Sequence, residues 1–462
     1  MTAAKSSGVL GRGGAVPAPL RVAAILLLPP ILLVLGLVLV VRLKEWSVDT
    51  AWERDFGPWE EFLARHPAQG ANDSAIELER LAAPLGIDLV PAVVSDRPRI
   101  SEKERAAQSG ARDLTSAHLK RNIEDPSPRV YETPAELADY LSLHAADLKG
   151  ILSRLLSGEV PRWEMDLERG WDTPLPRVEL IPLQRLLLVH ALERQRLGRP
   201  GEALEALEGA WRLNQSICER PEAISQRISM AVSRMQAAAL RKLGRAPAEW
   251  TARLGQLDYR AAWMDAMRAE AWKSLSPARA DFANLPIVRD EEPEEPGPLA
   301  QVVASWPLRP YWCLCVADWS DRFRQALLEA GSAPDLCMLD LEALVARWNE
   351  AVPGWNFYGK VKGMDSLKTF RRAGRIQLEL ELTRKVLEAK AARDANGGVW
   401  PAAIPGIETS ANPGGHWIYD LSRDGAVTIG YSEECEIPSA SGTKYPLFYT
   451  DEPPRSAGAQ VR

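Results

Sequence analysis

An uninterrupted apolar run near the start of the chain limits its fold more than any other feature. The run from Val22 to Val41 holds eight Leu, five Val and two Ile, and no charged side chain. As a helix rising about 1.5 Å per residue, such a run reaches about 30 Å, the hydrocarbon thickness of a bilayer. We therefore expect residues 22–41 to form a transmembrane helix that holds the chain in a lipid bilayer.

The alternative for this run is a cleaved secretory signal. The apolar core of such a signal spans only about 7–15 residues and ends at a small-x-small site. Here the run is longer and continues into Arg42-Leu-Lys-Glu-Trp46, which favours an uncleaved anchor. Trp46, Trp52 and Trp59 are then expected at the depth of the lipid headgroups or just beyond it, where an amphipathic indole is stable.

The charges are distributed unevenly along the chain. The formal net charge is −6, yet all the charged side chains of residues 1–44 are positive. The remainder of the chain is therefore strongly acidic. An acidic body is repelled by phosphate backbones, which argues against nucleic-acid binding. A short basic tail before the first apolar segment favours a cytoplasmic N-terminus. We expect a single-pass protein of a bacterial inner membrane, with its bulk in the periplasm.

Beyond about residue 45, helix signals predominate, and the predicted fold class is mainly α. Ser101-Glu-Lys-Glu104 has the spacing of a capping box. Thr133-Pro-Ala-Glu136 combines an N-cap hydroxyl with Pro at the first helical position, and it predicts a helix running to Ser157-Gly158. Further helices are predicted at about 178–197, 201–218, 222–243, 258–275, 318–330, 335–351 and 366–394.

Residues 184–217 resemble one tetratricopeptide unit. Ala191, Gly198, Ala203 and Ala210 fall at the small positions of that repeat, where two antiparallel helices approach closely. No second copy follows at the same period, so the resemblance implies one helical hairpin within an all-α body rather than a solenoid.

Residues 290–300 are acidic and rich in proline, which is typical of a solvated linker or loop. This segment suggests a domain boundary. The expected organisation is a flexible basic tail, a transmembrane helix, a helical domain, the linker, a helical region that ends in a β-hairpin, and an irregular tail, at residues 1–21, 22–41, 45–289, 290–300, 301–435 and 436–462.

The C-terminal part changes character. The helix expected over 366–394 carries a polar stripe, formed by Gln377, Glu381, Arg384 and Glu388, on an otherwise apolar surface. After the glycines near residue 397, the alternation at 416–421 and 426–431 predicts a β-hairpin that closes a small α+β module.

This combination of a long helix, the turn Asn396-Gly-Gly-Val-Trp-Pro401 and a hairpin resembles the tail of type II secretion pseudopilins and of similar uncharacterised bacterial envelope proteins. The resemblance covers about residues 366–431. In that family the helix is followed by a Gly-x-Tyr-Pro turn and a small antiparallel sheet, and here Trp400 replaces the Tyr. The resemblance implies a packing module, and it raises the alternative of an accessory subunit in secretion or pilus assembly.

Two pairs of side chains are candidate metal ligands. His144 with Asp147, and His190 with Glu193, each place an imidazole and a carboxylate one helical turn apart on one face. If the two pairs converged, they would support a metal-dependent hydrolase. Solvated or hydrogen-bonded histidines are the alternative, because a di-iron bundle requires two further carboxylates.

A cluster of basic residues is a candidate binding surface. It lies next to several aromatic residues and could meet anionic lipid headgroups or an acidic partner, while the alternative is an ordinary solvated helix start. Its members are Lys360, Lys362, Lys368, Arg371, Arg372 and Arg375.

Five cysteines form an odd and irregular set that does not resemble a disulfide framework. At most one or two disulfides are expected, with Cys313 or Cys315 to Cys337 the favoured pairing, and the alternative for these cysteines is small buried apolar side chains. No HExxH, GxSxG, P-loop or dinucleotide-binding pattern occurs in the sequence. The leading hypothesis is therefore a non-catalytic, membrane-anchored binding or scaffold protein of the envelope, with another protein or a cell-wall polymer as its partner.

Overall fold

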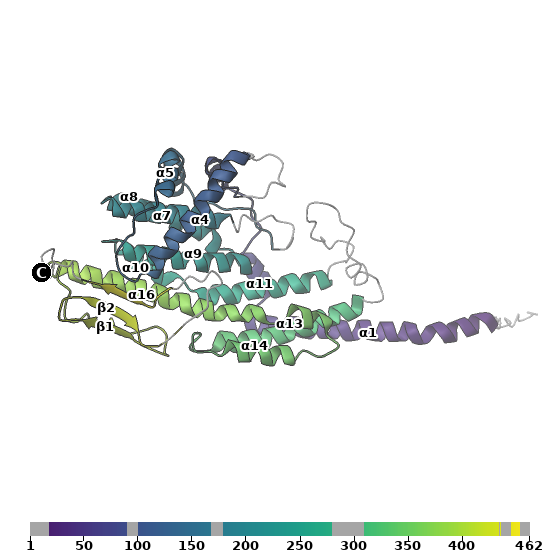
Figure 1. The fold of residues 1–462 in the computed structure, drawn as a ribbon. Coiled ribbons are helices and arrows are strands. Elements are labelled where there is room, and N and C mark those ends of the chain that lie inside the picture. Colours follow the sequence, from purple (N-terminus) through teal and green to yellow (C-terminus); the bar gives the residue numbers. More distant parts are fainter. Residues whose placement is uncertain are drawn as a thin grey trace, which may run out of the picture.

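Helices make up most of the molecule, and a small antiparallel sheet lies near its C-terminal end (Figure 1). The computed structural model describes residues 18–89, 100–167, 179–279, 309–433, 435 and 445–452. The mainly helical fold class predicted from the sequence is confirmed. The acidic segment at 290–300 lies outside the described residues.

The elements fall into two groups along the chain, before and after the undescribed residues 280–308. Before residue 280 they are α1 (Ala18–Phe56), α2 (Trp59–Arg65), α3 (Asp73–Ala82), η1 (Ala83–Leu85), α4 (Glu102–Glu124), α5 (Ala135–Leu143), α6 (Ala145–Ser157), α7 (Leu180–Arg196), α8 (Pro200–Cys218), α9 (Ala223–Lys242), α10 (Glu249–Gln256) and α11 (Tyr259–Arg279). After residue 308 they are α13 (Arg309–Ser332), α14 (Leu341–Glu350), α15 (Phe357–Lys362), η3 (Asp365–Lys368), α16 (Thr369–Ala395), β1 (Trp417–Leu421), β2 (Val427–Tyr431) and β3 (Phe448–Asp451).

Helix α1 has two halves with different surroundings. Its C-terminal half packs along α13, where Val48 and Trp52 are buried and the Trp52 indole donates to Ser320 Oγ over 3.0 Å. Its N-terminal half projects beyond the rest of the molecule (Figure 1). Leu37 is partly buried against the core, and the other large apolar side chains described there are exposed: Leu28, Leu32, Leu33, Leu35, Val38, Leu39 and Val40.

The structure does not support the transmembrane helix expected at 22–41. Within the described residues, no helix combines the length and the apolar content needed to cross a membrane.

The tryptophans after the apolar run do not share one environment. Trp46 is 69% exposed, and its place at a membrane interface stays a prediction. Trp52 and Trp59 are buried in the core instead, with their ring centroids 5.7 Å apart. The expectation of interfacial depth was therefore wrong for these two, because α1 packs against α13 from about Val41 onward.

Two helix starts were predicted from capping patterns, with different outcomes. The capping box at Ser101 is confirmed, since both reciprocal bonds with Glu104 are present. The predicted start at Thr133 is displaced to Ala135, because the Thr133 hydroxyl donates to Glu193 Oε2 on α7, 2.7 Å away, instead of capping its own helix. That helix also does not run unbroken to Ser157. It is divided at His144 into α5 and α6.

The predicted hairpin at 184–217 is present as α7 and α8, which pack tightly against each other. Gly198 turns the chain between them with a φ of 72°, a conformation that costs glycine nothing. Ala203 and Ala210 are fully buried at the crossing. Helix α9 packs on both α7 and α8, and α16 packs on α9, so the hairpin is one layer of a bundle rather than a repeat in a solenoid.

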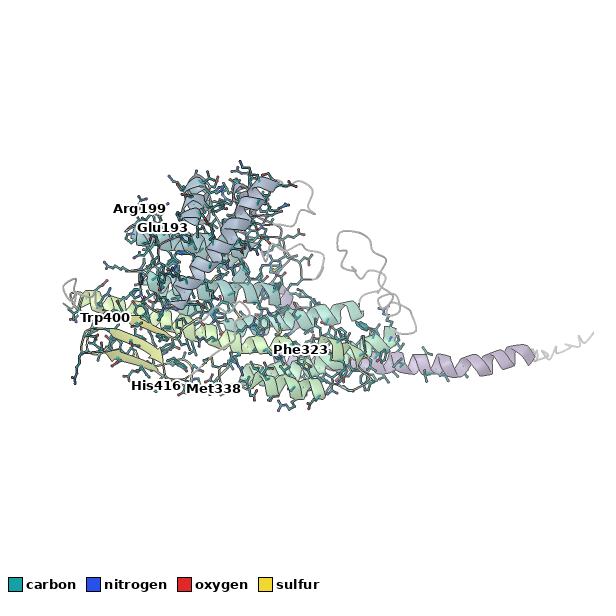
Figure 2. The ribbon with its side chains drawn as sticks, viewed as in Figure 1. Glu193, Arg199, Phe323, Met338, Trp400 and His416 are labelled. Carbon is teal, nitrogen blue, oxygen red and sulfur yellow. A yellow bond between two sulfur atoms is a disulfide. The ribbon has the colours of Figure 1, made fainter. Side chains whose placement is uncertain are left out.

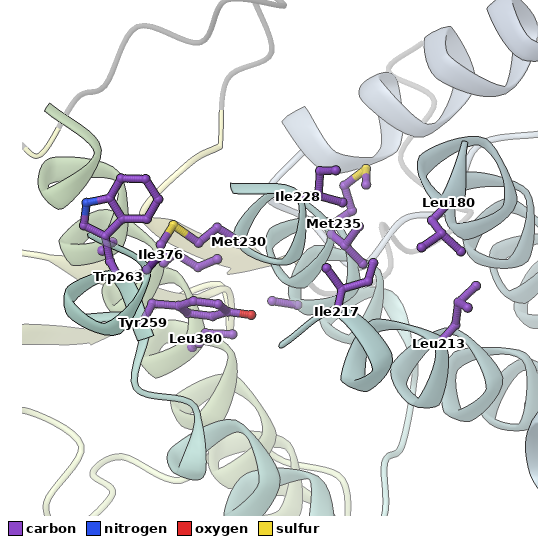
Figure 3. Packing of buried hydrophobic residues seen from close by; sticks show 14 of the residues in the cluster. Leu180, Leu213, Ile217, Ile228, Met230, Met235, Tyr259, Trp263, Ile376 and Leu380 are labelled. Atoms are coloured by element: carbon purple, nitrogen blue, oxygen red, sulfur yellow. The ribbon is translucent and has the colours of Figure 1, made fainter. Parts of the chain in front are cut away.

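One hydrophobic core includes helices from both sides of the proposed linker. It extends from Val41 on α1 to Leu387 on α16. Figure 3 shows part of it, where Tyr259 and Trp263 of α11 lie close to Ile376 and Leu380 of α16. Helix α11 also packs against α13, so the helices before and after 290–300 share their interior.

Two helices differ from the predicted bounds. Helix α13 begins at Arg309 rather than 318, with Pro310 in its first turn, a position that tolerates proline. Helix α14 begins at Leu341 rather than 335, because the Asp335 carboxylate accepts from the Cys337 and Met338 amides and holds that segment in a turn. Asp340 is the N-cap and accepts from the Ala343 amide.

Helix α16 connects the bundle to the sheet. One of its sides, with Ile376 and Leu380, faces the bundle core, while Leu378, Leu382 and Val386 belong to a second core formed with the sheet. The predicted hairpin is confirmed as β1 and β2, paired from Trp417 with Tyr431 to Leu421 with Val427. The tail after residue 435 was expected to be irregular, but it contains strand β3, which pairs with β2 as a third strand. Tyr449 of β3 is fully buried.

The disulfide joins Cys337 to Cys435, with their Cα atoms 5.7 Å apart. The predicted partners of Cys337 were wrong, since Cys313 and Cys315 are buried on α13 and are not disulfide-bonded. Cys435 lies just after β2, so the bond ties the segment before α14 to the sheet across 98 residues of chain.

Candidate functional site

The two predicted metal-ligand pairs have separate local roles. His144 Nδ1 lies 3.0 Å from Asp147 Oδ2 at the junction of α5 and α6, and the imidazole contacts the Tyr140 ring, with centroids 4.6 Å apart. This pair supports the start of α6.

His190 and Glu193 lie on α7, deeper in the bundle. Burial lowers the pKa of His190 to about 4, so its imidazole is neutral at physiological pH. Burial acts to raise the pKa of Glu193, but hydrogen bonds from Arg196 and Thr133 outweigh it and lower that pKa overall. Glu193 lies near the Arg199 turn at one edge of the bundle (Figure 2).

These four residues are not gathered into a ligand set. Among the described residues, no group of three or more His, Cys, Asp or Glu side chains lies close enough together to hold a metal ion. Glu193 is already engaged by a guanidinium 2.7 Å away and by the Thr133 hydroxyl. The described structure therefore does not bring the two pairs together as one ligand set, and the metal-dependent hydrolase stays a prediction.

The predicted basic cluster divides into two groups. Lys360, Lys362 and Arg372 are exposed, and Lys360 Nζ donates to the Asn349 carbonyl at 3.3 Å. The other three are less exposed: Lys368 pairs with Glu342 at 2.9 Å, Arg371 donates to the Leu339 carbonyl at 3.0 Å, and Arg375 is buried. The cluster is thus not one continuous binding surface.

Arg375 belongs to a buried charge network around Glu379 of α16. The Glu379 carboxylate, which is fully buried, accepts two bonds from Arg234 of α9, at 3.0 and 2.8 Å, and one from Arg375 at 2.9 Å. Arg375 also donates to the carbonyls of Cys435 and Tyr445. The Arg234 guanidinium lies over the Tyr445 ring, 3.9 Å from its centroid. This network joins the bundle, α16 and the sheet segment, so its role is structural.

Three residues of the polar stripe of α16, Gln377, Glu381 and Arg384, line a cleft of about 260 Å³. The opposite walls come from the end of α10, the start of α11 and the loops around Asp335 and Asn412. Gly255 leaves room for the Arg384 guanidinium, because a Cβ at this position would lie 3.3 Å from Nη1. The sequence indicated the stripe, but it did not indicate that a cleft faces it.

Some polar groups in this cleft are satisfied and others are not. Glu381 accepts from Ser410 Oγ at 3.0 Å and from the Ala411 amide at 3.1 Å, and Gln377 Nε2 donates to the Leu257 carbonyl at 2.9 Å. Within the described residues, Nε of Arg384 and Oε1 of Gln377 are buried atoms without a hydrogen-bond partner. A buried donor and a buried acceptor of this kind are costly unless water or a ligand bonds to them. The cleft is therefore the best candidate binding site among the described residues.

A second concave region is wider and more open. It has a volume of about 610 Å³ and lies between α3 and α6, lined by Asp73, Ile76, Glu77, Leu81, Gly150, Ser153, Arg154 and Ser157. Its Glu77 carboxylate is already paired with Arg80, at 2.6 Å. This groove offers fewer unsatisfied polar groups than the cleft.

Comparison with known proteins gives no match to a family model, to a curated protein or to a solved structure. The resemblances of the tail to pseudopilins and of α7–α8 to a tetratricopeptide unit stay predictions.

Proposed function

We propose that this protein is a membrane-anchored binding or scaffold protein of a bacterial envelope. Residues 22–41 hold it in the inner membrane, with the N-terminus in the cytoplasm. The helical body lies on the periplasmic side, where it binds another protein or a cell-wall polymer without catalysis.

The projecting half of α1 is the observation that carries the proposal. Most of its described leucines and valines are exposed, although each apolar side chain left in water is unfavourable. At the centre of a bilayer, a Leu, Ile or Val contributes about −0.3 to −0.6 kcal/mol. The fifteen branched aliphatic residues of 22–41 therefore supply several kcal/mol toward insertion, on the same principle.

The disulfide supports the periplasmic side. Disulfides persist in oxidising compartments such as the bacterial periplasm and are rare in the cytosol. Cys337 and Cys435 are bonded, and the bond joins the bundle to the sheet.

The α16 cleft supports a binding role. Arg384 offers a guanidinium to an acidic group, while the free oxygen of Gln377 accepts from a donor on the same partner. A cleft of about 260 Å³ admits a side chain or one small group of a larger partner.

The test of the anchor is membrane flotation of the full chain, with Leu33→Arg/Leu35→Arg as the altered protein. Each Arg at the centre of a span costs about 2.5–3.5 kcal/mol on the insertion scale, so the variant should leave the membrane fraction. Ile76→Arg, which changes a 53% exposed apolar residue of the body, is the matched control and should float.

The side of the membrane is tested separately with reporter enzymes fused after Arg462. Alkaline phosphatase should be active there, because it needs an oxidising compartment, and β-galactosidase should be inactive. Wild-type chain in the soluble fraction, or the opposite pattern of reporters, would contradict the proposal.

A further inference from the structure

Exposed aromatic and apolar side chains gather at one end of the body. Trp355, Phe357 and Val361 are 45%, 48% and 71% exposed, and Tyr311 at the start of α13 is 38% exposed. Lys360 and Lys362 lie among them and are also exposed. These six residues are called the α15 face. Exposed aromatic residues next to lysines are typical of surfaces that meet lipid headgroups.

The α15 face lies at the level where α1 enters the body. Tyr311 donates its hydroxyl to the Trp355 carbonyl, and Cys315 Sγ lies 3.9 Å from the same oxygen, so Trp355 is fixed to the first two turns of α13. Cys313 lies in those same two turns, and its pKa is raised by burial and, to a smaller extent, by the charge of Glu45 on α1. One short stretch of α13 therefore connects the face to the root of the projecting half of α1.

The face is held rigidly. Asn356 Nδ2 donates to the Cys315 carbonyl over 2.9 Å and to Asp318 Oδ2 over 2.8 Å, and Asn356 Oδ1 caps α15 by accepting from the Gly359 amide at 2.7 Å. Asn356 is fully buried. The Tyr358 ring packs edge-on against Trp312 and Trp319, with centroids 5.0 and 5.5 Å away. The outward direction of Trp355 and Phe357 is thus fixed by the fold.

From these observations we infer that the α15 face rests on the membrane as a second contact, in which Trp355, Phe357 and Val361 enter the headgroup layer and Lys360 and Lys362 bind anionic headgroups. This inference rests on the proposed anchor, since α1 brings the face to the surface. Trp46, at 69% exposure, and Leu43 are further exposed apolar residues on α1. Two lysines within reach of anionic lipid attract it by charge, which makes the contact dependent on lipid composition.

The test is photocrosslinking of the full chain in nanodiscs, with the photoreactive analogue p-benzoylphenylalanine in place of Phe357. A lipid adduct should form at this position, and its yield should rise when phosphatidylglycerol is added to phosphatidylcholine. Phe448 is the matched control, because it is also a phenylalanine, is 45% exposed and lies on the sheet away from α1. The analogue at position 448 should give no lipid adduct.

The double variant Lys360→Glu/Lys362→Glu should lower the phosphatidylglycerol-dependent yield at position 357 roughly tenfold. The control variant Arg199→Glu reverses the charge of an exposed residue at the turn between α7 and α8, and it should leave the yield at position 357 unchanged.

If the chain floats with its membrane but position 357 gives no more lipid adduct than position 448, the inference is overturned and the anchor stands. An adduct to a protein in native membranes would assign the face to an acidic partner instead. A chain that does not float contradicts the anchor, and the inference with it.

Discussion

At the scale of single residues, buried charge is the feature with the largest energetic consequence. Glu379 is the common acceptor for Arg234 and Arg375, and all three are shielded from water. Removing one charge from such a group leaves the others buried without compensation. The free energy that this costs exceeds what the intact ion pair contributes to stability.

Glu379→Leu should therefore lower the free energy of unfolding by about 3–5 kcal/mol, measured by chemical denaturation. Glu388→Leu is the control, because Glu388 is exposed on the same helix, and it should change stability by no more than about 0.5 kcal/mol. Equal effects of the two substitutions would show that the network contributes little.

His190 gives stability a defined dependence on pH. Its pKa in the folded protein is lowered to about 4 from an ordinary value of 6.5, because the imidazole is buried. Between these two values the unfolded chain binds a proton that the folded chain does not. The stability linked to His190 is fully present above pH 6.5 and is lost as the pH falls toward 4.

The difference in unfolding free energy between the wild type and His190→Gln should thus change by about 3 kcal/mol between pH 7 and pH 4. His66 and His118 also have lowered pKa values through burial, and they remain in both proteins, so the difference isolates His190. A difference that stays constant over this range would mean that His190 titrates normally.

At the scale of elements, α16 and the sheet depend on a covalent tie as well as on packing. The Cys337–Cys435 bond closes a long loop, and a bond of this kind typically stabilises a fold by about 2–4 kcal/mol.

Cys435→Ser should lower the free energy of unfolding by about 2–4 kcal/mol under oxidising conditions. Dithiothreitol should bring the wild type to the stability of the variant and should leave the variant unchanged. If reductant destabilises both proteins equally, another bond is responsible.

Several elements could be predicted from local sequence because their signals act locally. The capping box at Ser101 and the alternation of β1 and β2 need only neighbours in the chain. Thr133 carried a similar signal, but its hydroxyl bonds to Glu193, sixty residues away. Long-range contacts of this kind override a local preference and leave no mark in the local pattern.

The same reason limits what the sequence revealed about the site. The polar stripe of α16 was visible as a period, but the wall that makes it a cleft comes from Gly255 and Leu257, about 120 residues earlier in the chain. The partner of Cys337 was missed because Cys435 is brought near only by the sheet. Arg375 was grouped with exposed lysines, although its helix turns it inward to Glu379.

At the scale of the whole molecule, the helices on both sides of the acidic segment form one body. Helix α13 lies between α1 and α11, and α16 lies between the bundle and the sheet. Two walls of the cleft and the α15 face therefore belong to the same packed unit as the C-terminal half of α1.

The continuity of α1 has a mechanical consequence. The helix passes from its projecting half into the core as one continuous element, from Ala18 to Phe56. If residues 22–41 hold the protein in a membrane, as proposed, this continuity would keep the body and its α16 cleft at a fixed distance from the lipid surface. A partner would then have to reach that distance to occupy the cleft.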